Sequence, residues 1–405
     1  MEIRPIFASM RKHMIPATLI VLEIALACAV LCNAVFMISQ RVSDIHLPNA
    51  IDEQSLVTVT LRGTDDKLAG SDVPRNLAAL RGIAGVQSAA VISTLPLSTN
   101  NWGWSFGTKP ESTITDQSTT NVSLFFVGPG IDKTLGLRVV QGRFFNDDDY
   151  ANSSLGSAPL PETHAVVLTK SLVEKMWPGQ PALGKTMYTT GHYYTVVGVM
   201  ADVLRPNIGG QNYSTAFFPL GAAGSKGVQA YYVMHCDPQD RDRIVREAEL
   251  KLATINPGAV AKGQTYSEIR TKYFANMSSM AWMLVLVCVV MLAVTAFGIV
   301  GLTSFWVNQR RRQIGVRRAV GATRGHIMRY FQTENFLLST AGVVFGMALA
   351  FGINAYLMQH YELNRMPWYY LPCGAIALWV IGQLSVFGPA RRAAAVPPVV
   401  ATRSA

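Results

Sequence analysis

The chain has 405 residues, of which 50% are hydrophobic and only 15% are charged, and its mean hydropathy is +0.23. This composition is too apolar for an ordinary soluble protein of that length, so membrane spans are the first feature to identify. The formal net charge of +10 could indicate nucleic-acid binding, but the excess of basic residues lies beside apolar segments. That placement favours a topology signal and no nucleic-acid partner.

Four segments are long and apolar enough to cross a hydrocarbon layer of about 30 Å as helices. Each contains at most two strongly polar residues, and the segments are 14–38, 280–307, 336–358 and 369–387. The first follows three basic residues, as the core of a secretory signal does. Its apolar run is longer than a signal core of about 7–15 residues, so we interpret it as an uncleaved anchor.

Basic residues next to the spans predict the topology. They flank the first span, fill the connection between the second and third, and follow the fourth, and these stretches carry the whole net charge. They are Arg4, Arg11, Lys12, Arg310, Arg311, Arg312, Arg317, Arg318, Arg324, Arg329, Arg391, Arg392 and Arg403. Because positive charge marks the cytoplasmic side, both termini are expected in the cytoplasm and the loop after the first span outside it.

The long loop 41–279 has the pattern of an α+β domain. Strand-type patterns cover 55–61, 86–93, 165–168, 196–200, 214–219, 230–236 and 259–266, and helix-type patterns cover 74–80 and 239–255. We interpret the two ends of the loop, 41–99 and 213–279, as one split α+β subdomain. The middle, 100–212, is richer in glycine, serine and threonine and is interpreted as an inserted β-rich subdomain.

A polar stretch at 98–120 is expected to be a mobile loop that carries Trp102, Trp104 and Phe106. Two interpretations of these aromatic residues stay open. In the first, they contact a partner or ligand. In the second, they anchor the loop to the core of their own domain. Anchoring is favoured, because large aromatic side chains are mostly buried.

The segment 179–186 reads GQPALGKT and satisfies the phosphate-binding pattern G-x-x-x-x-G-K-[ST]. That pattern binds phosphate when a buried strand precedes it and a helix follows it. Here the order is reversed, and Pro181 removes one backbone amide. We therefore predict a turn. The seven histidines are scattered as well, so no catalytic, cofactor or metal site is expected on the chain.

Two carboxylates and several glycines lie within the spans. Glu23 is costly at its depth unless it is paired, so it is expected to face another helix in a packing or dimer contact. A proton relay is the weaker interpretation, because no further acid or histidine lies at that depth. Glu334 is close to Arg329 in sequence and is expected to form an ion pair. Glycines that allow close helix approach are Gly298, Gly301, Gly342 and Gly346.

The connection 308–330 reads NQRRRQIGVRRAVGATRGHIMRY. It is expected to continue the helix of the second span, to break near Gly321, and to enter the third span through a short helix. Its seven arginines exceed what orientation needs, and apolar residues interleave with them, namely Ile314, Val316, Ala319 and Val320. Such a segment can dock into a groove of another protein.

The segment 297–327, FGIVGLTSFWVNQRRRQIGVRRAVGATRGHI, resembles the signature of FtsX-like permeases, particularly the MacB-type branch of ABC transporters. Three further blocks, 138–148, 166–186 and 194–203, resemble parts of the MacB-type periplasmic core domain, and 389–395 resembles the basic tail of that family. The resemblance covers essentially the whole chain in order. The chain departs from it at Gln313 and near Val400, where the family usually has an acidic residue.

The resemblance implies a multi-pass protein of the bacterial inner membrane with four transmembrane helices. A large α+β periplasmic domain of two subdomains lies between helices 1 and 2. The predicted organisation is 1–13 cytoplasmic N-terminus, 14–38 first span, 41–279 periplasmic core domain, 280–307 second span, 308–335 coupling segment, 336–358 third span, 359–368 short periplasmic loop, 369–387 fourth span and 388–405 cytoplasmic tail.

The resemblance also implies a non-catalytic permease subunit, with ATP and Mg²⁺ bound to a separate cytoplasmic ABC ATPase dimer. The subunit would pair with a second permease, identical or homologous, and often with a periplasmic adaptor and an outer-membrane duct. ATP hydrolysis would move the periplasmic domain and drive export of a substrate from the periplasm or outer leaflet. The residues implied in ATPase coupling are Arg310, Arg311, Arg312, Ile314, Gly315, Arg317, Arg318, Gly321, Ala322 and Thr323.

Two other functions remain open from the sequence. An FtsX-like signalling subunit would activate a periplasmic partner such as a cell-wall hydrolase. A membrane receptor would bind a ligand in its outer domain, but only short basic segments are expected on the cytoplasmic side to pass a signal on.

Overall fold

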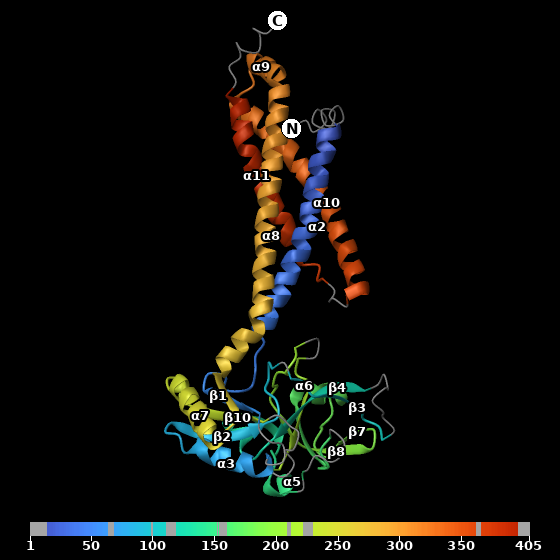
Figure 1. Ribbon diagram of the computed structural model, residues 1–405. Coiled ribbons are helices and arrows are strands. Elements are labelled where there is room, and N and C mark those ends of the chain that lie inside the picture. The colour runs from blue at the N-terminus through green and yellow to red at the C-terminus, as the bar shows by residue number, and fades with distance from the viewer. Residues whose placement is uncertain are drawn as a thin grey trace. The chain divides into compact units, whose positions relative to one another are not determined.

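Figure 1 shows the computed structural model of the chain. It describes residues 14–63, 69–98, 100–110, 119–151, 153, 160–208, 212–221, 230–361 and 366–395. The chain forms two compact units. We call them the helical unit (Met1–His46 with Asn276–Ala405) and the sheet unit (Leu47–Ala275).

Among its described residues, the helical unit contains four long apolar helices and one short basic helix, and the second long helix begins in the sheet unit and enters the helical unit at Asn276. They are α2 (Met14–Ile45), α8 (Tyr266–Gln309), α9 (Arg311–Ala319), α10 (Arg324–Tyr361) and α11 (Tyr370–Ala394). The four long helices are apolar and long enough to cross a membrane, which confirms the predicted spans. Each ends beyond its predicted span, because hydropathy marks only the apolar part of a helix whose backbone pattern continues into polar residues.

The sheet unit contains one mixed sheet of eleven strands in the order β11-β1-β10-β2-β4-β9-β6-β8-β5, with β3 on β4 and β7 on β8. The strands are β1 (Leu56–Arg62), β2 (Val86–Ile92), β3 (Gly103–Phe106), β4 (Thr120–Val127), β5 (Val139–Gly142), β6 (Ala165–Thr169), β7 (Thr186–Thr189), β8 (His192–Met200), β9 (Thr215–Pro219), β10 (Tyr231–Cys236) and β11 (Val260–Thr265). The helices of this unit are α3 (Ala69–Arg81), α4 (Ile131–Leu135), α5 (Asp147–Ala151), α6 (Lys170–Met176) and α7 (Arg241–Ile255).

The sheet has two halves that meet at β2 and β4. These two strands, both fully described, are joined through the residue pair Ile92↔Val127. On one face a single core cluster crosses the junction and includes Ile92 and Phe125. Alternate residues of the two strands face the opposite side, and there the core is divided. A helix cluster lies under α3 and α7, and a separate strand cluster lies around Phe126.

Strand pairing differs from the predicted subdomains at one strand. The first half combines β1 and β2 with β10 and β11, which come from the two ends of the loop. β9 was expected with them, but it pairs parallel to β4 and antiparallel to β6. Its place follows from packing, because the rings of Phe125 and Phe217 stack with centroids 5.1 Å apart. β9 therefore joins the strands of the segment 100–212.

The segment expected to be a mobile loop contains a strand. β3 pairs antiparallel with β4, and Phe106 is fully buried. Trp102 and Trp104 pack against the strand cluster, and Trp104 Nε1 donates a hydrogen bond of 3.0 Å to Thr189 Oγ1. The loop prediction was wrong for these residues, whereas the anchoring interpretation of the aromatic side chains is confirmed. The remainder, 111–118, lies outside the described residues.

The phosphate-loop-like segment is a turn between α6 and β7, so the predicted reversed order of helix and strand is confirmed. Lys185 donates a hydrogen bond to Gln180 Oε1, and its Nζ lies 5.7 Å from the centroid of the Trp177 ring. Local contacts therefore occupy the lysine that would have to reach a phosphate.

Replacing Lys185 with alanine is expected to change the free energy of unfolding by less than about 1 kcal/mol, because its contacts are exposed. A photoreactive ATP analogue should leave the peptide containing 179–186 unlabelled in both the parent and the variant. Labelling of this peptide in the parent that disappears in Lys185→Ala would overturn the assignment of a simple turn.

Candidate functional site

The candidate site is the basic connection between α8 and α10, which contains α9. Ile314 and Gly315 are buried, and α9 contacts α11 in the core of the helical unit. Arg311, Arg312 and Arg317 are exposed. The segment therefore combines buried positions that hold it in place with an exposed set of arginines.

The apolar residues of this segment divide between two environments. Ile314 is only 5% exposed, because it packs into the core of its own unit rather than onto the surface. Val316 and Val320 are 50% and 84% exposed. The apolar surface open to another protein is therefore formed by the two valines and the exposed Ala319. Ile314, which the resemblance implies in coupling, instead anchors α9 to the core of the helical unit.

A buried ion pair fixes the start of the segment. Arg310 Nη1 lies 3.1 Å from Glu334 Oε1 and 3.2 Å from Oε2, and the two side chains are 8% and 2% exposed. The guanidinium also lies 5.6 Å from the ring centroid of Trp306. The sequence pointed to Arg329 as the partner of Glu334, but five residues along one helix put the two side chains on different faces. Arg310, in the turn between α8 and α9, reaches Glu334 on α10 instead.

The predicted break at Gly321 is confirmed, but the expected continuation of the second-span helix was wrong, because α8 ends at Gln309 and a turn at Arg310 separates it from α9. Gly321 has φ +103°, a conformation that glycine adopts at little cost, and α9 ends just before it. The Ala322 amide donates to the Arg317 carbonyl at 3.0 Å. Thr323 Oγ1 accepts a hydrogen bond of 3.3 Å from the His326 amide and so caps the start of α10.

A second contact across this turn comes from an arginine on α9. The Arg317 guanidinium lies 5.1 Å from the ring centroid of Tyr330 on α10, which is a cation–π distance. Arg318 is partly buried. The break therefore reverses the chain between two helices that stay tied together, and it presents the remaining arginines at one end of the helical unit.

The helices α2 and α10 of the helical unit are in close contact at two glycines of α10. A Cβ at Gly342 would lie 2.8 Å from Ile24 Cβ, and one at Gly346 would overlap Cys28 Cβ. Where the helices approach, Asn33 Nδ2 donates to the Ala350 carbonyl at 3.3 Å. The glycines identified in the third span therefore lie where two helix backbones nearly touch.

Glu23 on α2 contacts α8 at Gly298, whereas no described residue of another helix lies close to the Cβ position of Gly301. Any Cβ at Gly298 on α8 would overlap the Glu23 carboxylate, so Glu23 does face another helix. A Cβ at Gly301 would meet nothing within 4 Å among the described residues.

Sequence reasoning missed two glycines on α11. A Cβ at Gly374 would lie 2.6 Å from Cys32 Sγ, and one at Gly382 would lie 3.0 Å from Ser339 Oγ. Gly374 therefore approaches α2, and Gly382 approaches α10. Glycines within the fourth span were the available signal for these close helix contacts.

Comparison with protein families matches the chain to two family models. Residues 18–250 match the MacB-like periplasmic core domain, and residues 285–398 match the FtsX-like permease C-terminal region. The first match covers more than half of the chain, and the second contains the candidate site.

The names of several relatives describe membrane transport proteins. The macrolide export ATP-binding/permease protein MacB of Chromobacterium violaceum is 27% identical over 69% of this chain and 43% of its own length. MacB of Nitrosomonas europaea is 30% identical over 66% of this chain and 40% of its own. The chain thus spans well under half the length of these relatives. A Bacillus subtilis protein named ABC transporter permease YknZ is 21% identical over 70% of each chain.

Solved structures of low identity align with part of the chain. The periplasmic region of MacB from Actinobacillus actinomycetemcomitans is 16% identical, covers 55% of this chain and 94% of its own, and has a TM-score of 0.38. The extracellular domain of YknZ is 15% identical, covers 52% and 99%, and has a TM-score of 0.35. The family matches carry the assignment: the chain belongs to the family of membrane proteins with a MacB-like periplasmic core domain and an FtsX-like permease segment.

Proposed function

We propose that the chain is the permease subunit of an ABC transporter and that a separate cytoplasmic ATPase dimer drives it. The main observation behind this proposal is the exposed set of arginines on α9. The buried Arg310–Glu334 pair fixes the start of that helix, and the whole segment matches FtsX-like permeases. In this proposal the chain itself is not catalytic, and ATP and Mg²⁺ bind to the partner. The helical unit crosses the bacterial inner membrane with both termini in the cytoplasm, and the sheet unit is periplasmic.

The exposed side of α8 supports a second permease as a further partner. Trp282, Val290 and Phe297 are all more than half exposed on this helix. Side chains of this kind can face lipid or another apolar helix, and Gly301 among them allows close helix approach. We place Gly301 in the contact between two permeases, while other parts of α8 face lipid.

In the proposed mechanism the ATPase docks on the arginines and valines of α9 and moves the helical unit. That movement changes the conformation of the periplasmic domain and drives export of a substrate from the periplasm or outer leaflet. An adaptor and an outer-membrane duct would carry the substrate onward. The names of the MacB relatives, which combine ATP binding, permease and export, support this direction.

Reversing two exposed charges of α9 is the direct test. The double variant Arg311→Glu with Arg312→Glu is expected to lower transport-coupled ATP hydrolysis about tenfold. The new negative charges would repel the surface of the ATPase that the arginines attract in this proposal. ATPase rate and co-purification of the ATPase are measured in nanodiscs. The matched control is Arg246→Glu, an exposed arginine on α7 of the sheet unit. Equal effects of both changes would refute the docking role of α9.

The alternative function, a transmembrane signalling subunit, uses the same segment and rests on the FtsX-like match. Purification of the tagged full chain in mild detergent separates the two proposals. An ATPase with a second permease supports the transporter. A cell-wall hydrolase on the sheet unit, with an ATPase and no exported substrate, supports signalling.

A further inference from the structure

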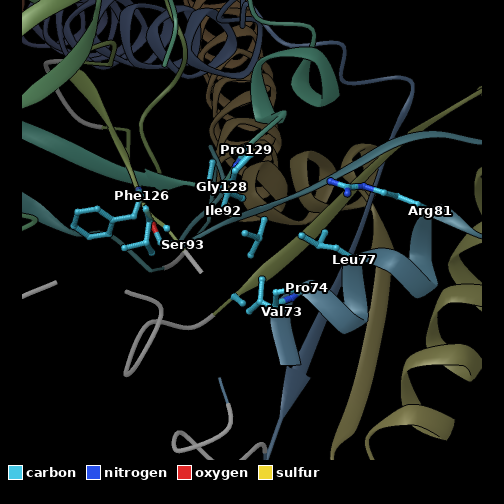
Figure 2. Close-up of a pocket in the computed structure, with 13 residues that line it drawn as sticks. Val73, Pro74, Leu77, Arg81, Ile92, Ser93, Phe126, Gly128 and Pro129 are labelled. Atoms are coloured by element: carbon cyan, nitrogen blue, oxygen red, sulfur yellow. The ribbon is translucent and has the colours of Figure 1, made fainter. Parts of the chain in front are cut away.

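A cavity of about 250 Å³ opens in the sheet unit between α3 and the ends of β4 and β9. Its walls include Val73 and Leu77 of α3, Ile92 of β2, Phe126 of β4, and Leu220 just after β9. Figure 2 shows Val73 and Leu77 on one side of this space and Ile92 and Gly128 on the other, with the Phe126 ring directed away from α3. The lining is therefore mainly apolar, and it comes from both halves of the sheet.

The position of the cavity follows from the junction between the two halves. On this face the helix cluster and the strand cluster do not merge, whereas the opposite face has one continuous core. A Cβ at Gly128 would lie 2.6 Å from Val91 Cγ1 and 3.4 Å from the Val91 carbonyl oxygen, so β2 and the end of β4 approach each other closely beside the cavity. The cavity is thus the space between the helix cluster and the strand cluster, beside the junction of β2 and β4.

Backbone groups at the junction already have partners. The Ser93 amide donates to the Phe126 carbonyl at 2.9 Å, and the Phe126 amide donates to Ser93 Oγ at 3.0 Å. The Gly128 amide donates to the Val91 carbonyl at 2.9 Å. An apolar group that enters the cavity therefore leaves none of these polar groups without a hydrogen bond.

One residue gives the cavity a charge. Arg81 at the end of α3 is exposed, and it is the one charged side chain among the described residues that line the space. Its Nε and Nη2 donate to the Ala89 carbonyl at 3.1 and 2.8 Å, which holds the guanidinium in place. Figure 2 shows the guanidinium end directed from α3 toward the side of Ile92. Nη1 takes part in neither of these bonds and can donate to an anion.

We propose that this cavity binds a carboxylate with an apolar body, such as a medium-chain fatty acid, with the carboxylate on Arg81. A cavity of about 150 Å³ holds benzene and drug-sized sites begin at about 300 Å³, so this one suits an apolar body between those sizes. A bound ligand would contact α3 and β4 together and so join the two cores across the junction. The proposal concerns the sheet unit alone and stands independently of the ATPase.

The test uses the purified full chain in nanodiscs and a fatty acid of about ten carbons that carries a photoreactive diazirine. Peptides containing Val73–Arg81 and Phe126–Pro129 are expected to be labelled, and decanoate should compete better than decanol. Labelling of lipid-facing peptides of α8 serves as the internal reference. Binding should also raise the melting temperature of the chain.

Three variants define the site. Val73→Phe and Ala230→Phe each add a ring to the lining of the cavity and should each lower labelling about tenfold, relative to α8. Arg81→Gln should lower it about threefold, because a charge-assisted hydrogen bond is lost at an exposed site. Arg75→Gln, which removes another charge from α3, should leave it unchanged. Melting temperatures show which variants are folded, and two filling variants guard against the failure of one.

Two results would overturn the proposal. Labelling confined to the membrane helices, or unaffected in a folded filling variant, would show that the cavity takes no such ligand. Equal competition by decanoate and decanol, together with normal labelling of Arg81→Gln, would show that Arg81 does not select an anion.

Discussion

Replacing Gly346 with leucine is expected to separate α2 from α10 and to destabilise the helical unit by more than about 3 kcal/mol. A Cβ there would overlap Cys28 Cβ and lie 2.6 Å from the Ala25 carbonyl oxygen. Overpacking costs about 1–3 kcal/mol where side chains can adjust, but here a helix backbone blocks the added atoms. The helices would have to move apart, which would also break the hydrogen bond from Asn33 to the Ala350 carbonyl.

The measurement is the melting temperature and monodispersity of the full chain in detergent. Gly352→Leu is the matched control, because it makes the same change in α10 where a Cβ would meet nothing within 4 Å among the described residues. The control is expected to behave like the parent. If Gly346→Leu melted with the parent as well, the close approach of α2 and α10 would be wrong.

Breaking the buried ion pair is the second large effect that we expect. Glu334→Leu alone should destabilise the chain by about 3–5 kcal/mol, because it leaves the Arg310 charge buried without its partner. Arg310→Met alone should have a similar cost. The double variant should recover most of the loss, since apolar residues of similar volume can replace a buried pair at little cost.

A double-mutant cycle on melting temperature or denaturant resistance measures this coupling. Arg324→Met, which removes an exposed arginine of the same basic segment, is the control and should change stability by less than about 1 kcal/mol. Purely additive effects of the two single variants would show that the pair does not hold α8 and α10 together.

The features that could be predicted from the sequence are those that a short stretch specifies by itself. Hydropathy identified the four spans, because about 20 apolar residues in a row have few alternatives to a membrane helix. The break at Gly321 was predictable, because a glycine follows the last helix-type residues. Alternating residues identified β1, and the order of helix-type and strand-type patterns around 179–186 was enough to predict a turn in place of a phosphate site.

Features that depend on a distant partner were not predictable. The periodicity of β9 shows that it is a strand, but not that it pairs with β4 and β6. β3 is too short and polar to stand out from a loop until β4 pairs with it. Glu334 signalled an ion pair, but proximity in sequence pointed to Arg329, whereas Arg310 reaches it from the turn between α8 and α9. The cavity beside Arg81 arises only where two cores meet.

The pairing of β1 with β10 on one side and β11 on the other also affects how the sheet unit folds. β1 leaves the ribosome early, but both of its neighbours come from the far end of the loop. At about 5–20 residues per second, the separation of about 170 residues between β1 and β10 leaves β1 without a neighbour for on the order of 9–34 s. During that interval an apolar strand with two open edges can pair with another chain. Slow synthesis between β1 and β10 should therefore favour aggregation, and factors that shield nascent strands should matter more for this protein than for one with local strand pairing.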